Sequence, residues 1–161
     1  MTSIALALHI LASVIWVDGM FTIYVCLRPA LGALERPADR LIIIEATFGK
    51  FFPWVWLSIV LLFATGYLML FTTQGGFQFA GLHVHIMQGV AWVMVLLFGW
   101  LYWGAWADFR DAVGEKSWEQ AGKDLVRIRQ IIAVNLPLGL ILVAIGASGA
   151  GGPRPASLTS V

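Results

Sequence analysis

The stretch Ile4–Leu27, IALALHILASVIWVDGMFTIYVCL, decides the fold of this chain. At about 1.5 Å per residue, a helix of this length exceeds the roughly 30 Å hydrocarbon core of a bilayer. The stretch also contains a histidine, His9, and a carboxylate, Asp18. Ionisable side chains are costly in hydrocarbon, so inside a membrane-spanning helix they are candidates for a functional site. The stretch therefore predicts a transmembrane helix that does more than anchor the protein.

The composition identifies an integral membrane protein in contact with the lipid bilayer. The chain of 161 residues is 60% hydrophobic and 12% charged, whereas soluble domains are about 45–50% apolar and about 25% charged. A net charge of +1 without a basic stripe argues against nucleic acid as a partner. The single cysteine, Cys26, excludes an internal disulfide and a metal site made of cysteines alone.

Four apolar segments are long enough to span a bilayer, and we expect all four to be helices. They lie at residues 4–27, 51–71, 82–106 and 128–147. The sequence thus predicts an all-α membrane domain over residues 1–148, folded as an up-down-up-down four-helix bundle. Residues 149–161 are rich in Gly and Pro and predict a flexible tail.

Local signals predict further helix outside the apolar segments. Pro37 suits the first turn of a helix, so the second helix is expected to begin there, well before its apolar part. The segment 106–130 mixes charges at helical spacing, with Glu119 and Lys123 at positions i and i+4. We interpret that segment as a solvated helical connector.

The distribution of Lys and Arg predicts the orientation in the membrane. Residues 28–50 and 106–130 carry nine of the ten positive side chains, and residues 72–81 carry none. Positive connectors stay in the cytoplasm. The first and third connectors are therefore expected to be cytoplasmic, and both termini are expected on the outer side.

All three histidines, His9, His83 and His85, are predicted to lie near the outer surface. The first and third helices run in the same direction, and the histidines follow their N-terminal ends at depths that agree within about one turn. Neutral imidazole binds copper, zinc, iron and nickel, and it is the usual axial ligand of haem. Zinc catalysis is disfavoured because no HExxH motif is present. The histidines could instead be interfacial side chains that bond water or backbone.

The spacing of His83 and His85 leaves their arrangement open. Two residues apart on a helix they diverge by about 200°, so either the HVH stretch is partly unwound or only one of them faces the bundle. Met20 shares a helix face with His9, and Met87 shares one with His83. These thioethers are either soft auxiliary copper ligands or ordinary packing residues.

A second set of polar residues lies deeper in the apolar segments. Asp18 is about 180° around the helix from His9 and about 13 Å deeper, and Asn135 lies at a similar depth on the fourth helix. One hypothesis is that Asp18 pairs with Asn135 or reaches Arg127 or Arg129. The alternatives are a protonated, structural Asp18 and a contact between protomers of a homodimer.

The first helix resembles that of the copper-resistance D (CopD) family. The resemblance rests on His9, on the WVDGM turn at residues 16–20 and on the Arg28-Pro29 pair. The stretches GLHVHIMQG and RIRQIIAVNLPLGLILVAIG look like the third and fourth helices of small members, so the resemblance covers most of residues 4–148. Asp18 departs from the pattern, because the family usually has glycine there.

This resemblance implies a multi-pass protein of the bacterial inner membrane that handles copper on the periplasmic side. It would take copper up or deliver it to a periplasmic copper protein, and it would not be an enzyme. His9, His83 and His85 would form an outward-facing copper site, with Met20 and Met87 as auxiliary ligands.

A weaker resemblance leads to a different class of function. The His-bearing first helix and the fourth helix also resemble the bacterial membrane protoporphyrinogen oxidase family, whose members bind haem b. On that interpretation the chain is an oxidoreductase with a respiratory partner, and His9 with His83 or His85 would be the axial ligands. A structural or assembly subunit whose histidines bind nothing is the third alternative.

Overall fold

The computed structural model describes residues 2–73 and 75–149, and these are helical almost throughout. Within these two ranges, four helices are long and apolar enough to cross a membrane. We call them the first to fourth spans: Ser3–Ala33, Pro37–Thr73, Leu82–Gly114 and Trp118–Ala147. The predicted all-α fold with four transmembrane helices is confirmed. The tail predicted at residues 149–161 lies outside the described residues from position 150 onward.

Two of the four spans contain π-helical turns. The first span consists of α1 (Thr2–Ser13), a π turn (Val14–Asp18), α2 (Gly19–Phe21), a π turn (Thr22–Leu27), α3 (Arg28–Ala30) and a 3-10 turn (Leu31–Ala33). The second span is α4 (Pro37–Thr73), the third is α5 (Leu82–Trp100), a π turn (Leu101–Ala105) and α6 (Trp106–Gly114), and α7 (Trp118–Gly149) contains the fourth. Single π turns widen a helix locally and are frequent at functional sites.

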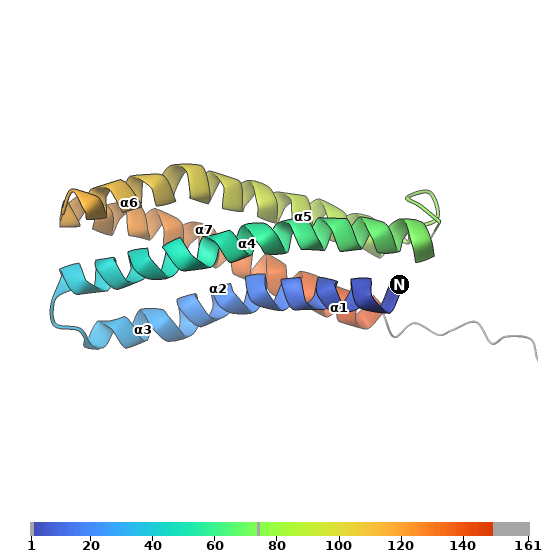
Figure 1. Ribbon diagram of the computed structural model, residues 1–161, viewed down its shortest axis with the longest axis horizontal. Helices are drawn as coiled ribbons and strands as arrows, with labels where there is room; N and C mark the ends of the chain where they lie inside the picture. The colour runs from blue at the N-terminus through green and yellow to red at the C-terminus, as the bar shows by residue number, and fades with distance from the viewer. Residues whose placement is uncertain (1, 74, 150–161) are drawn as a thin grey trace, which may run out of the picture.

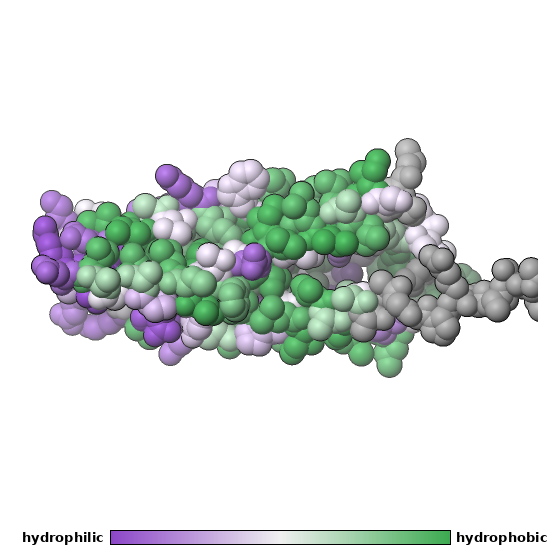
Figure 2. Space-filling view, turned by 90° about the horizontal axis from the view of Figure 1, so that it is seen from below, coloured by the Kyte–Doolittle hydropathy of each residue, from purple (hydrophilic) through white to green (hydrophobic). Residues whose placement is uncertain are grey.

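Successive spans run antiparallel, which gives the predicted up-down-up-down bundle (Figure 1). The most extensive packing is between α1 and α4 and between α7 and both helices of the third span, α5 and α6, so the bundle is two helical hairpins laid against each other. The N-terminus and the connector between α4 and α5 lie at one end, which we call the outer end (Figure 1). The opposite, inner end carries the hydrophilic surface, while apolar residues cover most of the rest of the face in Figure 2.

Aromatic side chains fill the inner half of the core. Phe52 stacks on Phe48 with ring centroids 5.0 Å apart, and it meets Trp106 at 5.2 Å and Phe98 at 5.4 Å edge to face. Lipid tails are as apolar as these rings, so close packing rather than removal from water holds the helices together. This layer fixes how the two hairpins meet.

The inner connectors confirm the local predictions. Helix α4 begins at Pro37, and the third connector is helical through α6 and the start of α7. The Lys123 ammonium donates to the Glu119 carboxylate at 2.8 Å, as their spacing predicts. These contacts depend on neighbours in the sequence, so they could be predicted without the tertiary structure.

Candidate functional site

His9 lies in the interface between α1 and α4, half-buried, with Nδ1 2.8 Å from the Thr65 hydroxyl oxygen. That hydroxyl donates its own hydrogen to the Leu61 carbonyl at 2.6 Å. A hydroxyl has one hydrogen, so the Thr65 oxygen accepts from His9, and Nδ1 carries the imidazole proton. The carbonyl of Leu62 also lies near the ring. The contact therefore selects the tautomer with an unprotonated Nε2.

Nε2 of His9 is available to a ligand. The hydrogen bond described for Nδ1 joins it to Thr65, and Nε2 is not one of the fully buried atoms that lack a partner. Gly66 leaves room beside the ring, because a Cβ there would lie 3.5 Å from Cε1 of His9. A histidine whose Nδ1–H is held by a second group and whose Nε2 is free has the usual arrangement of a metal ligand.

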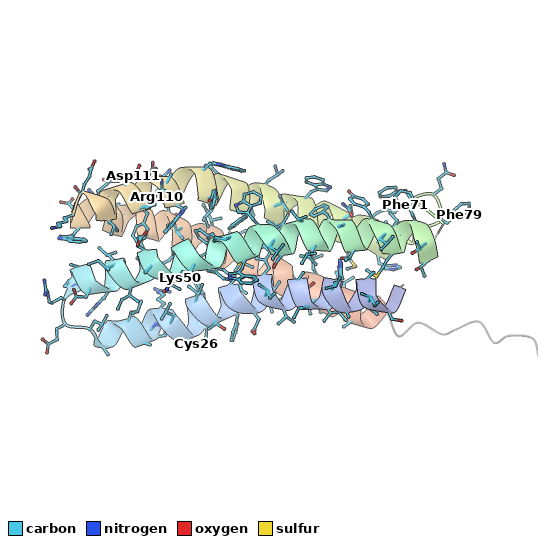
Figure 3. The ribbon with its side chains drawn as sticks, in the orientation of Figure 1. Cys26, Lys50, Phe71, Phe79, Arg110 and Asp111 are labelled. Atoms are coloured by element: carbon cyan, nitrogen blue, oxygen red, sulfur yellow. The ribbon has the colours of Figure 1, made fainter. Side chains whose placement is uncertain are left out.

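His83 and His85 lie in the first turn of α5 at the outer end. The HVH segment is helical, and both side chains are exposed. The His83 ring lies against Gly81, and the His85 ring stacks on Phe77 with centroids 6.3 Å apart. In the same region Phe71 lies in the last turn of α4 and Phe79 lies on the connector (Figure 3). The two imidazoles are thus accessible at the mouth of the bundle.

The three histidines share one end of the bundle at different depths. Gln88 donates to the Tyr67 hydroxyl at 2.8 Å, which sets the relative height of α5 and α4. From that register, His85 lies about 7 Å further out than His9. Over the described ranges 2–73 and 75–149, no three His, Cys, Asp or Glu side chains group closely enough to hold a metal ion. The histidines form a series along the axis rather than one preformed ligand set.

The two methionines proposed as auxiliary ligands lie in different places. Met20 is 4% exposed, about 16 Å along the helix from His9, and lines a void in the middle of the bundle. Met87 is half-buried on α5, with its methyl group against Gly146 of α7. Neither residue packs beside His9 in the contacts described.

The central void beside Met20 is also lined by two polar groups without partners. Asn135 is 2% exposed and its amide donates to the Met94 carbonyl at 3.4 Å. Its oxygen and the indole N–H of Trp16 have no hydrogen-bond partner within the described residues. The Asn135 oxygen is a buried acceptor and the Trp16 N–H is a buried donor, so the void has two polar groups in the middle of a mostly apolar core.

Asp18 does not pair with Asn135. Its side chain is exposed on the outside of the first span, and none of the hydrogen bonds or ion pairs found among the described residues involves it. Arg127 instead contacts Asp108 and Asp124, at 3.1 and 3.5 Å. Arg129 faces a separate groove near the inner end.

Thr65 is the residue that the sequence reasoning missed. The local signal is its position next to Gly66, a polar and a small residue that follow the apolar stretch at residues 59–64. Its role becomes visible only when α1 is placed against α4.

Thr65→Val is expected to weaken metal binding by about tenfold while the fold is retained. Valine has the shape of threonine but cannot accept from His9, so the imidazole loses its fixed tautomer, and loss of such a partner lowers metal affinity by about 10–100-fold. The check is a Cu(I) competition titration of the variant. Thr72→Val is the matched control, because Thr72 is exposed and its hydroxyl donates to the Leu68 carbonyl of its own helix. Equal affinities of the two variants would contradict the orienting role of Thr65.

Comparison with known protein families shows what the chain is similar to. The model of the family CopD, described as Copper resistance protein D, matches residues 45–148. The match includes His83 and His85 and extends from the second span to the fourth, whereas His9 precedes it. No curated protein matches the chain. No solved structure matches it either.

Proposed function

Because the chain belongs to the copper resistance protein D family, we propose that it binds copper at the outer end of the bundle and passes it inward. Membership makes it a multi-pass membrane protein that handles copper. Beyond membership, we propose which residue binds copper, in which direction copper moves and which side of the membrane the outer end faces. Copper is the cargo, His9 is its central ligand, and the outer end faces the periplasm of a bacterial inner membrane, as the positive connectors indicate.

The observation that carries the proposal is the hydrogen bond between His9 and Thr65. It leaves Nε2 of a half-buried imidazole unprotonated and reachable. Imidazole binds copper as a neutral ligand through a ring nitrogen. Among the hydrogen bonds of the described residues, His9 is the one histidine whose ring nitrogen is bonded to another side chain, which fixes its tautomer.

The depth of the other donors supports inward movement. His83 and His85 are exposed at the mouth, His9 is half-buried below them, and Met20 is buried beside Asn135 at the central void. Imidazole and thioether are both ligands that suit Cu(I). Donors of this kind thus lie at successive depths between the outer surface and the middle of the membrane, which supports uptake.

The test is copper analysis and an optical spectrum of detergent-purified protein loaded with Cu(I), beside His9→Ala. The matched control is Leu8→Ala, an exposed neighbour on the same helix. We expect nearly one copper per chain in the wild type and in Leu8→Ala, no Soret band, and loss of the copper in His9→Ala. A Soret band that disappears in His9→Ala would overturn the proposal in favour of a haem b protein. Copper retained by His9→Ala would remove His9 from the site.

A further inference from the structure

A groove near the inner end lies outside the copper-handling site. It is formed by the end of the first span, by α4 and by α7, and it contains about 330 Å³ of space, its open side included. Its walls are mostly apolar, with Ile23, Leu27 and Phe48 among them. Two arginines, Arg28 and Arg129, line the same groove. Figure 3 shows this inner region from the side, where Cys26 of the first span and Lys50 of α4 are labelled.

The two arginines of the groove have no anionic partner among the described residues. The Arg28 guanidinium lies 5.5 Å over the Tyr24 ring, and Nε of Arg129 is buried without a hydrogen-bond partner. The positive charge of Arg28 also acts on the Arg129 guanidinium. Two like charges at one apolar groove are unfavourable unless an anion joins them.

The other arginines of the described ranges contrast with this pair, because each has a polar partner. The contacts are Arg36 with Asp39, Arg40 with the carbonyls of Gly32 and Leu34, Arg110 with Asp111, and Arg127 with Asp108 and Asp124. Unpaired guanidinium groups are therefore concentrated at the groove, which points to a partner from outside the chain.

The position of the groove indicates the chemistry of that partner. Arg28 follows the apolar part of the first span, and Arg129 precedes the apolar part of the fourth, so both lie where hydrocarbon meets headgroups. Guanidinium binds phosphate oxygens in a bidentate manner, and basic pockets between transmembrane helices on this side bind anionic headgroups. Apolar walls below such a site suit an acyl chain.

We propose that the groove binds an anionic phospholipid. Its phosphate lies between Arg28 and Arg129, and one acyl chain follows Ile23, Leu27 and Phe48. A zwitterionic lipid brings its own amine to the phosphate and leaves the two guanidinium groups without net compensation. A free phosphate ion would neutralise the charges of the two arginines but would leave the apolar walls of the groove uncovered. The ligand chemistry is thus a phosphate diester attached to an acyl chain.

The proposal is tested by lipid binding to the delipidated full chain in detergent. Native mass spectrometry measures the apparent Kd for phosphatidylglycerol, and thermal unfolding is followed with phosphatidylglycerol, phosphatidylcholine or inorganic phosphate. The double variant Arg28→Gln, Arg129→Gln removes the paired charges. The matched control is Arg110→Gln, Lys116→Gln, which removes two exposed charges from the same end, with Arg110 on α6 (Figure 3).

We expect phosphatidylglycerol to bind the double variant at least about tenfold more weakly than the wild type, because both charge-assisted hydrogen bonds to the phosphate are lost. The control should change by less than about threefold, in line with general surface attraction. Leu27→Trp keeps both arginines and fills part of the groove, so it should also weaken the binding of phosphatidylglycerol. This second variant keeps the test valid if the double variant does not fold.

Other outcomes would overturn the proposal. Stabilisation by inorganic phosphate equal to that by phosphatidylglycerol would make this a site for the free anion. If phosphatidylcholine bound as tightly as phosphatidylglycerol, the groove would recognise the acyl chain and not the net charge of the headgroup. If the control variant lost as much affinity for phosphatidylglycerol as the double variant, the lipid would be attracted by the positive charge of the whole inner surface and not by the groove.

Discussion

Gly139→Leu is expected to lower the free energy of unfolding by about 3 kcal/mol. Gly139 is buried on α7, and even a Cβ at that position would lie 2.9 Å from Val17 and 3.1 Å from Met94. Those contacts come from two other spans, so a leucine must push α7 away from both. Because close packing holds membrane helices together, separation at this point weakens the whole bundle. Unfolding in sodium dodecyl sulfate, followed by Trp fluorescence, measures the change.

Gly89→Leu provides the matched control for this prediction. Gly89 is also within a membrane-spanning helix, but it is exposed, and a Cβ there would meet nothing within 4 Å. Leucine is favoured over glycine in a helix by about 0.5–1 kcal/mol, so this variant should be neutral or slightly more stable. If both variants lost the same stability, the close approach at Gly139 would not be the cause.

Arg127→Leu is expected to destabilise the inner end by about 2 kcal/mol. The Asp124 carboxylate is 1% exposed and is contacted by Arg127 and by Gln120, at 3.5 and 3.0 Å. Without the guanidinium, a buried carboxylate retains only the neutral amide. The contact between Arg127 and Asp108, which joins α6 to α7, is lost as well. The expected loss of stability is smaller than that for breaking a fully buried ion pair, because the Arg127 side chain is 52% exposed.

Arg110→Leu removes the same charge without this consequence. Arg110 and Asp111 are 58% and 71% exposed, and exposed pairs contribute about 0–1 kcal/mol. The two variants are compared by thermal unfolding in the same detergent. A drop in the midpoint for Arg110→Leu equal to that for Arg127→Leu would show that charge at the inner end matters, rather than the partner of Asp124.

The candidate site was predictable in part. The location of all three histidines at one end follows from two parallel helices and their positions along the chain. Their convergence into one ligand set does not appear in the described contacts, because His83 and His85 are exposed on α5 while His9 faces α4. Helix direction sets depth, but the rotation of each helix about its own axis sets what its side chains meet.

By itself the sequence determined four spans, their alternation and the charged inner end. Each depends on the length of an apolar segment, on Pro37 or on nearest-turn pairs such as Glu119 with Lys123, which are local or one-dimensional properties. Only the tertiary structure decided that Thr65 orients His9, that Asp18 faces outward and that Arg28 meets Arg129 at one groove. In a membrane both the core face and the lipid face of a helix are apolar, so hydrophobic periodicity does not reveal which face turns inward.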